Sequence, residues 1–233
     1  RLRRPGGMSV AGPQTQGSAP SLLSSSRFDR STRLCSRSPT IAIFNPASGL
    51  FRWPNSQQGY SPFSTWTRGL AWAILGFAEQ FEFLLSVPNE DLLQCGFPRS
   101  CEKHLRRGKE VVTRRYVPNF AEFANAAIFT AAFYTDISCA DGIAMWDTGA
   151  PNLHLLPANY LNKPSDPYNK FEPVDSSAAA IAAQGCIRLG SFFTTHGLEE
   201  IGPYYRQAGL TIAKTLFSEP YLSTDPKHQG LLL

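Results

Sequence analysis

Residues 58–77 read Gln-Gly-Tyr-Ser-Pro-Phe-Ser-Thr-Trp-Thr-Arg-Gly-Leu-Ala-Trp-Ala-Ile-Leu-Gly-Phe, and this is the most informative stretch of the chain. Apolar side chains recur from there at steps of three or four residues, as on one face of a helix: Trp66, Leu70, Ile74, Phe77, Phe81 and Leu84. The spacing predicts a helix over residues 66–86. A hydroxyl of Ser64 or Thr65 is expected to cap it, because an oxygen there accepts a hydrogen bond from an unpaired N–H of the first turn.

Two indoles and a guanidinium fall within the first two turns of this predicted helix: Trp66, Arg68 and Trp72. One interpretation is a site for a planar or anionic guest, because an arginine binds anions and aromatic faces bind flat or cationic groups. The other interpretation is structural: the tryptophans fill the core and Arg68 pairs with a nearby carboxylate. Composition alone leaves both open.

The string Gln-Gly-Tyr-x-x-x-Ser-x-Trp-x-Arg-Gly-x-Ala-Trp-x-x-x-Gly resembles the signature of the unsaturated glucuronyl hydrolases, family 88 of the glycoside hydrolases. Further segments resemble other motifs of that family and follow in the same order: 44–49, 141–147, 175–181 and 230–233. Each motif alone is weak, but five in order are specific. The resemblance covers about residues 40–233. Thr40 and Met145 stand where the family pattern has histidine and tyrosine.

Four helices are predicted, at about 66–86, 119–135, 176–193 and 198–217. Asn119 and Asp175 are the expected caps of the second and third. The third is apolar nearly all round, so we expect it to be buried on all sides, whereas the others are amphipathic. This alternation fits two concentric helix layers. The resemblance implies the same all-α fold, a double-ring (α/α)6 helical barrel, of which this chain holds about the second half.

The chain divides at about residue 40. Residues 1–39 are rich in Ser, Arg, Gly and Pro without apolar periodicity, so a disordered tail is expected there, and 40–233 form the partial barrel domain. Because the first residue is Arg1 rather than Met, we expect a fragment or an incomplete gene model. A strand is expected at 40–44, some helix around 102–107, and small elements or a functional role in the long loop 139–174. Because half a barrel exposes inner helices, we expect self-association or burial by a partner.

Composition and charge limit the function classes. Of the 22 Lys and Arg, seven lie in residues 1–40 beside a single acid, Asp29, so the net charge of +4 belongs to the tail. A nucleic-acid binder is a third reading, but no recognition motif accompanies the basic tail and we expect no nucleic-acid partner. Glu79, Gln80 and Glu82 lie in the apolar stretch 70–86, so no membrane span is expected there.

The five cysteines form no CxxC pair and no disulfide framework. Cys95, Cys101 and His104 have poor spacing for a metal site and lack a fourth ligand, so we expect no metal and no cofactor. No signal peptide is visible. These observations favour the cytoplasm over secretion without fixing the location.

The resemblance implies a substrate and a reaction. The family acts on oligosaccharides that carry an unsaturated uronic acid at the non-reducing end, and releases that sugar by hydrating its C4–C5 double bond. A carboxylic acid must donate the proton and then accept one from water. The two aspartates that the family uses lie earlier than the matched segments, so no catalytic residue is assigned here. The expected binding residues are Gln58, Arg68 and Trp72, with Trp66 as a largely structural neighbour.

Alternatives remain open. The chain could be a non-catalytic helical remnant that at most binds acidic sugars, or belong to the related unsaturated rhamnogalacturonyl hydrolases, which share the Trp-x-Arg-Gly-x-Ala-Trp string. Asp175 is interpreted as a helix cap, and Asp141 and Asp147 as turn residues rather than a replacement catalytic pair. The histidines 154, 196 and 228 show no triad or ligand spacing.

Overall fold

The computed structural model describes residues 41–94, 101–107, 110–116, 118–196, 200–225 and 227–228. Helices make up most of the described chain: α2 (Thr67–Ser86), α3 (Asn89–Gln94), α4 (Pro118–Ile137), η2 (Leu153–Leu155), η3 (Tyr160–Asn162), α5 (Ser176–Thr195) and α6 (Ile201–Leu216). The strands form two separate antiparallel hairpins: β1 (Ile41–Phe44) with β2 (Phe51–Asn55), and β3 (Cys101–Arg107) with β4 (Glu110–Tyr116). The predicted tail, Thr40 and the motif at 230–233 lie outside the described residues.

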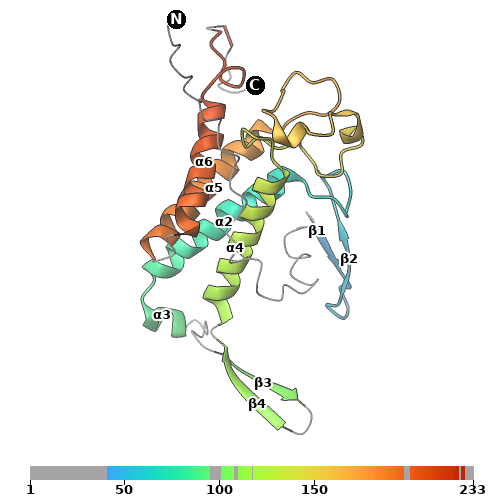
Figure 1. Ribbon diagram of the computed structural model, residues 1–233. Coiled ribbons are helices and arrows are strands. Elements are labelled where there is room, and N and C mark those ends of the chain that lie inside the picture. Colours follow the sequence, from blue (N-terminus) through green and yellow to red (C-terminus); the bar gives the residue numbers. More distant parts are fainter. Residues whose placement is uncertain are drawn as a thin grey trace, which may run out of the picture.

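Helices α2 and α5 run parallel, and Figure 1 shows α5 between α2 and α6. Arg68 pairs with Asp175 where both helices begin, and Phe81 stacks on Phe192 toward their ends, at 4.8 Å between ring centroids. A mostly helical chain was predicted, and the structure confirms it. No helix in the described part is long and apolar enough to cross a membrane.

Helices α4 and α6 run antiparallel to the parallel pair. Phe123 near the start of α4 meets Phe77 of α2 at 6.0 Å between ring centroids, whereas Ile137 at the end of α4 lines a cavity with Thr67. Two parallel helices backed by antiparallel ones fit the predicted two-layer arrangement.

Glycines set the spacing between α5 and α6. A Cβ added to Gly190 would lie 2.3 Å from the backbone nitrogen of Arg206, and one added to Gly209 would lie 2.7 Å from the carbonyl oxygen of Ala183. Neither helix can accept a side chain at these points, so the two backbones are in direct contact. The small residues of α5, which is the third helix predicted from the sequence, therefore allow its backbone to pack closely against α6.

The expectation that this third helix is buried on all sides is wrong. One stripe of α5 is exposed along its whole length, formed by Ser177, Gln184, Ser191 and Thr195. The opposite faces are buried against α2 and α6, but no described element covers this stripe. These exposed residues are polar or small, so solvent can bond their polar groups and none of them is buried without a hydrogen-bond partner.

Two expected helix caps are also wrong. The first long helix begins at Thr67, and neither Ser64 nor Thr65 caps it, because the hydroxyl of Ser64 bonds within its own turn to the Ser61 carbonyl (3.2 Å). Helix α4 begins at Pro118, so Asn119 lies inside its first turn. Proline suits that first position because it has no N–H to leave unpaired. Helix α6 begins at Ile201, three residues after the expected start.

The helix expected around residues 102–107 is wrong as well, since this segment is strand β3. Its partner β4 carries Val111, Val112 and Thr113, whose branched side chains favour extended backbone. The strand expected at 40–44 is confirmed as β1, although β2 was not predicted. Gly49 closes the turn between them with a positive φ of 68°. The long loop contains η2 and η3, small elements of the kind expected.

Candidate functional site

A short segment of the long loop, residues 144–148, joins the starts of α2 and α5. The carbonyl oxygen of Trp146 accepts the N–H of Thr67 (3.1 Å), and that of Ala144 accepts the N–H of Asp175 (2.9 Å). The N–H of Thr148 also donates to the carbonyl of Thr65 (3.1 Å). Three of the motifs identified in the sequence, at 58–77, 141–147 and 175–181, therefore meet at the end of the helix pair where α2 and α5 begin.

Asp147 is fully buried at the centre of this junction. Its Oδ1 accepts the N–H of Gly149 at 2.8 Å, which confirms the predicted turn, and its Oδ2 accepts the N–H of Tyr60 at 2.9 Å. The second bond ties the Gln58-Gly59-Tyr60 motif to the junction. Gly59 is packed so closely there that an added Cβ would lie 3.0 Å from the Cβ of Trp66.

Arg68 and Asp175 form an ion pair across the two helix starts. The Asp175 Oδ2 accepts from Arg68 Nε (3.1 Å) and Nη2 (3.0 Å), while its Oδ1 accepts the N–H of Ala178 (2.8 Å). The predicted cap is confirmed, and so is the pairing of Arg68 with a carboxylate. The other half of the structural interpretation, in which both tryptophans fill the core, is wrong for Trp72, which is 55% exposed. The aspartate side chain is 3% exposed and the arginine side chain 43%. Asp175 therefore fixes a guanidinium that still faces solvent.

A second contact holds the same guanidinium from another side. Its central carbon lies 5.7 Å from the centroid of the Trp66 ring, a cation–π contact. Within the described residues, Arg68 Nη1 has no hydrogen-bond acceptor. A carboxylate from solvent can thus reach a charged donor whose position is already set.

The remaining predicted binding residues lie near Arg68 in the chain and differ in how far they are exposed to solvent. Trp72 follows Arg68 by one helical turn and is 55% exposed, so its indole face is open. Trp66 is half-buried, and Gln58 is exposed in the loop that packs on Trp66. The structure gathers Trp66, Arg68 and Trp72 at the start of α2. Gln58 precedes Gly59, which packs on Trp66, and no hydrogen bond to another described residue fixes the Gln58 side chain.

Glu172 is a polar residue of this end that sequence reasoning missed. It is buried, its Oε2 accepts the indole N–H of Trp146 at 2.8 Å, and its Oε1 accepts the N–H of Asn152 at 2.6 Å. Trp146 in turn meets the ring of Tyr60 edge-on at 6.5 Å. The sequence around Glu172 does not predict these hydrogen bonds, because the bonded residues lie 20 and 26 positions away in the chain.

The other chemically capable side chains have structural partners. Asp141 accepts the N–H and hydroxyl of Ser165 at 2.9 and 2.6 Å, so it organises the loop as a turn residue. Burial raises the pKa of the Cys139 thiol to about 11 and that of Cys186 to about 12, so both are protonated and poorly nucleophilic at neutral pH. His154 and His196 bond to nearby backbone carbonyls.

Metal-ligating side chains do not gather in the part of the chain that the structure describes. Cys95 and the side chains of Cys101 and His104 lie outside it.

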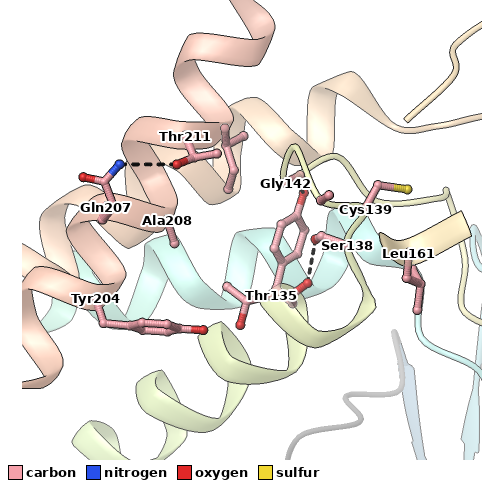
Figure 2. Close-up of a pocket in the computed structure, with 12 residues that line it drawn as sticks. Thr135, Ser138, Cys139, Gly142, Leu161, Tyr204, Gln207, Ala208 and Thr211 are labelled. Carbon is pink, nitrogen blue, oxygen red and sulfur yellow. Dashed lines mark hydrogen bonds between the residues drawn. The ribbon is translucent and has the colours of Figure 1, made fainter. Parts of the chain in front are cut away.

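A cavity of about 400 Å³ lies between the end of α4 and α6 (Figure 2), and Arg68 is not among the residues that line it. Its hydroxyls are mostly engaged within the protein: Thr135 bonds the carbonyl of Ala132, and Ser138 that of Tyr134. Gln207 bonds Thr211, as Figure 2 shows. With no charged group in its lining, this cavity does not suit an acidic sugar.

Comparison with known proteins bears on the fold. No protein-family model matches the sequence, and no curated protein matches it. Among solved structures, an unsaturated glucuronyl hydrolase specific for heparin is similar over 82% of this chain and 37% of its own, with 21% identity and a TM-score of 0.51. The unsaturated glucuronyl hydrolase responsible for glycosaminoglycan degradation in Bacillus sp. GL1 is similar over 87% of this chain and 41% of its own, with 22% identity and a TM-score of 0.51.

A further structure, an aspartate-to-asparagine variant of UGL with dGlcA-Glc-Rha-Glc, gives 22% identity and a TM-score of 0.50 over the same shares. The resemblance read from the motifs is confirmed in the fold: the chain has the fold of part of a helical barrel of this type. It spans about two fifths of the length of these structures.

Proposed function

We propose that this chain binds the unsaturated uronic acid end of an acidic oligosaccharide. It would do so as part of a glycoside hydrolase of the unsaturated glucuronyl hydrolase type, which releases that sugar by hydrating its C4–C5 double bond. The observation that carries the proposal is the guanidinium of Arg68, held by the buried Asp175 and the Trp66 ring while an edge stays exposed. A structural ion pair alone does not require a half-exposed arginine beside an open indole.

Each predicted residue suits one part of such a ligand. The exposed edge of Arg68 binds the uronate carboxylate through charge-assisted hydrogen bonds. Trp72 offers an open face to a ring flattened by its double bond, and Gln58 offers an amide to the ring hydroxyls. The parallel helices α2 and α5 also direct their N-terminal, partly positive ends toward this region.

We assign no catalytic acid among the described residues. The oxygens of Asp147, Asp175 and Glu172 already accept hydrogen bonds from backbone or side-chain N–H donors. Hydration of the double bond needs a carboxylic acid free to exchange a proton with the substrate. The role proposed for this chain is therefore substrate binding.

Calorimetric titration with an unsaturated chondroitin disaccharide tests the proposal. Arg68→Ala should weaken binding about tenfold or more, because a hydrogen bond to a charged group contributes roughly 1.5–3 kcal/mol. Arg188→Ala is the matched control, since it removes an exposed arginine from the same helix pair. Equal losses in both variants, or none in either, would contradict the proposed role of Arg68.

A non-catalytic sugar binder is the second candidate, and the engaged carboxylates favour it. The ultraviolet absorbance of the unsaturated uronate separates the two, because hydration destroys the chromophore. Binding without a fall in absorbance is the result expected of the non-catalytic chain. Binding with a fall would mean that this chain supplies its own proton donor, with Asp141 and Asp147 as the first carboxylates to replace.

A further inference from the structure

A second cavity, of about 420 Å³, lies within the long loop that joins the two helix starts. Cys139, Met145 and Leu156 contribute to its apolar lining, and the carbonyl of Met145 accepts the Thr67 hydroxyl at 2.8 Å. The cavity therefore borders the junction at the start of α2, although none of the proposed uronate-binding residues lines it. Its volume is in the usual range for a small-molecule site.

Aromatic and basic side chains line the rest of this cavity. Three rings contribute, Tyr160, Tyr168 and Phe171, and the Tyr168 side chain is strongly exposed, at 67%. Lys163 and Lys170 also line it, and neither ammonium lies within ion-pair distance of a carboxylate in the described residues. The cavity thus combines open ring faces with two positive charges that form no ion pair among the described residues, beside the single carboxylate of Asp166.

Several other polar groups of the lining already form hydrogen bonds within the protein. The amide nitrogen of Asn169 donates to the carbonyls of Asp166 and Glu172, both at 2.7 Å. The Ser165 hydroxyl bonds Asp141, and the Oδ1 of Asp166 accepts the N–H of Tyr168 (2.9 Å). These bonds fix the shape of the loop before any ligand arrives, so little ordering is needed on binding.

We propose that this loop cavity is an additional binding site for an anionic sugar, with the two lysines on its sulfate or carboxylate and the aromatic rings on its ring face. Lysine suits this role as a compact charge that binds an anion without a fixed geometry. The choice of a sugar among anionic ring compounds rests on the proposed function. The site itself rests only on this lining.

Titration of the full chain with N-acetylgalactosamine 6-sulfate, followed by amide NMR shifts, tests the inference. This probe has no uronate carboxylate, so it separates the loop cavity from the Arg68 site. We expect the double variant Lys163→Met/Lys170→Met to weaken binding about tenfold, since two charge-assisted contacts are lost. Tyr168→Ala should weaken it about fivefold through the lost ring contact.

Lys214→Met/Lys227→Met removes the same charge from exposed lysines outside the cavity, and it should leave binding of the probe unchanged. Equal loss in both double variants would reduce the effect to net charge and overturn the inference. So would absence of binding to the unaltered chain, or tighter binding of adenosine monophosphate than of the sugar. If Arg68→Ala fails to weaken the unsaturated disaccharide while the lysine variant weakens the sulfated sugar, the proposed function fails and the loop site stands.

Discussion

The two ends of the α2–α5 pair use the same kinds of charged residue in opposite surroundings. At the end where both helices begin, Arg68 pairs with Asp175, whose side chain is almost fully buried. Farther along, Arg188 pairs with both Glu79 and Glu82 on the exposed stripe of the two helices. All three of these side chains are half exposed.

The two ion pairs differ in the further contacts that their charged residues make. Asp175 also caps α5 and sits against a loop segment whose carbonyls bond both helix starts, so its loss disturbs several contacts. Within the described part of the chain, Arg188 bonds the two glutamates and no other group, and water can replace the guanidinium as their hydrogen-bond donor. A charge held this firmly at one end, with an edge left in solvent, supports the binding role that we propose for Arg68. The exposed cluster is an ordinary surface network.

The largest expected effect comes from Asp175→Ala. We expect the free energy of unfolding to fall by about 2–4 kcal/mol, because a cap contributes roughly 0.5–2 kcal/mol and a charge-assisted hydrogen bond roughly 1.5–3 kcal/mol. Urea unfolding measures this loss. Asp175→Asn keeps an oxygen that can accept the Ala178 N–H, so it should lose less. If Asp175→Asn loses almost nothing while Asp175→Ala loses the full amount, the cap rather than the ion pair dominates this end, and the contrast with Arg188 disappears.

A smaller effect is expected from Asp147→Ala, which leaves the N–H groups of Tyr60 and Gly149 without their acceptor. Each buried unpaired donor costs roughly 1–3 kcal/mol, but Tyr60 is exposed enough to recruit water, so we expect a total of about 1–3 kcal/mol. Asp225→Ala is the control, since Asp225 accepts the N–H of Lys227 in an exposed turn and its loss should cost under about 0.5 kcal/mol. Unfolding curves that shift equally would show that the junction adds nothing to an ordinary turn.

Sequence patterns predict the parts of the fold that depend on local periodicity. The start of α2 was expected at residue 66 and lies at Thr67, because the apolar stripe sets the helix whatever surrounds it. The segment 102–107 was predicted wrongly because its extended form depends on pairing with β4, which no local pattern encodes. The wet stripe of α5 was missed for a similar reason: burial depends on which neighbours are present.

The residues of the candidate site likewise fall into those that a local sequence pattern identifies and those that depend on partners far away in the chain. Arg68, Trp66 and Trp72 could be singled out because they share one helical start and a recognisable motif. The partner of Arg68 could not, because Asp175 lies 107 residues away and its local pattern indicates only a cap. Glu172 and the lysine-bearing loop cavity depend on how the long loop folds back on itself, which the spacing of its residues does not reveal.

The smallest expected effect is that of Arg188→Met, which removes the exposed network. We expect the free energy of unfolding to change by about 0–1 kcal/mol in low salt, because exposed ion pairs are screened and lose side-chain freedom. High salt should reduce the difference further. A loss that equals that of Asp175→Ala would abolish the distinction between the two ends.

The pH dependence of that small difference identifies its source. The hydrogen bond from Arg188 lowers the pKa of Glu82, and burial only partly opposes it. A carboxyl whose pKa is lower in the folded state stabilises the protein above its unfolded pKa, and this stabilisation is lost as pH falls through the lowered folded value. The gap between the unaltered chain and Arg188→Met should therefore be present at neutral pH and close in acid. A gap that persists in acid would mean that the aliphatic part of Arg188, rather than its charge, packs between α2 and α5.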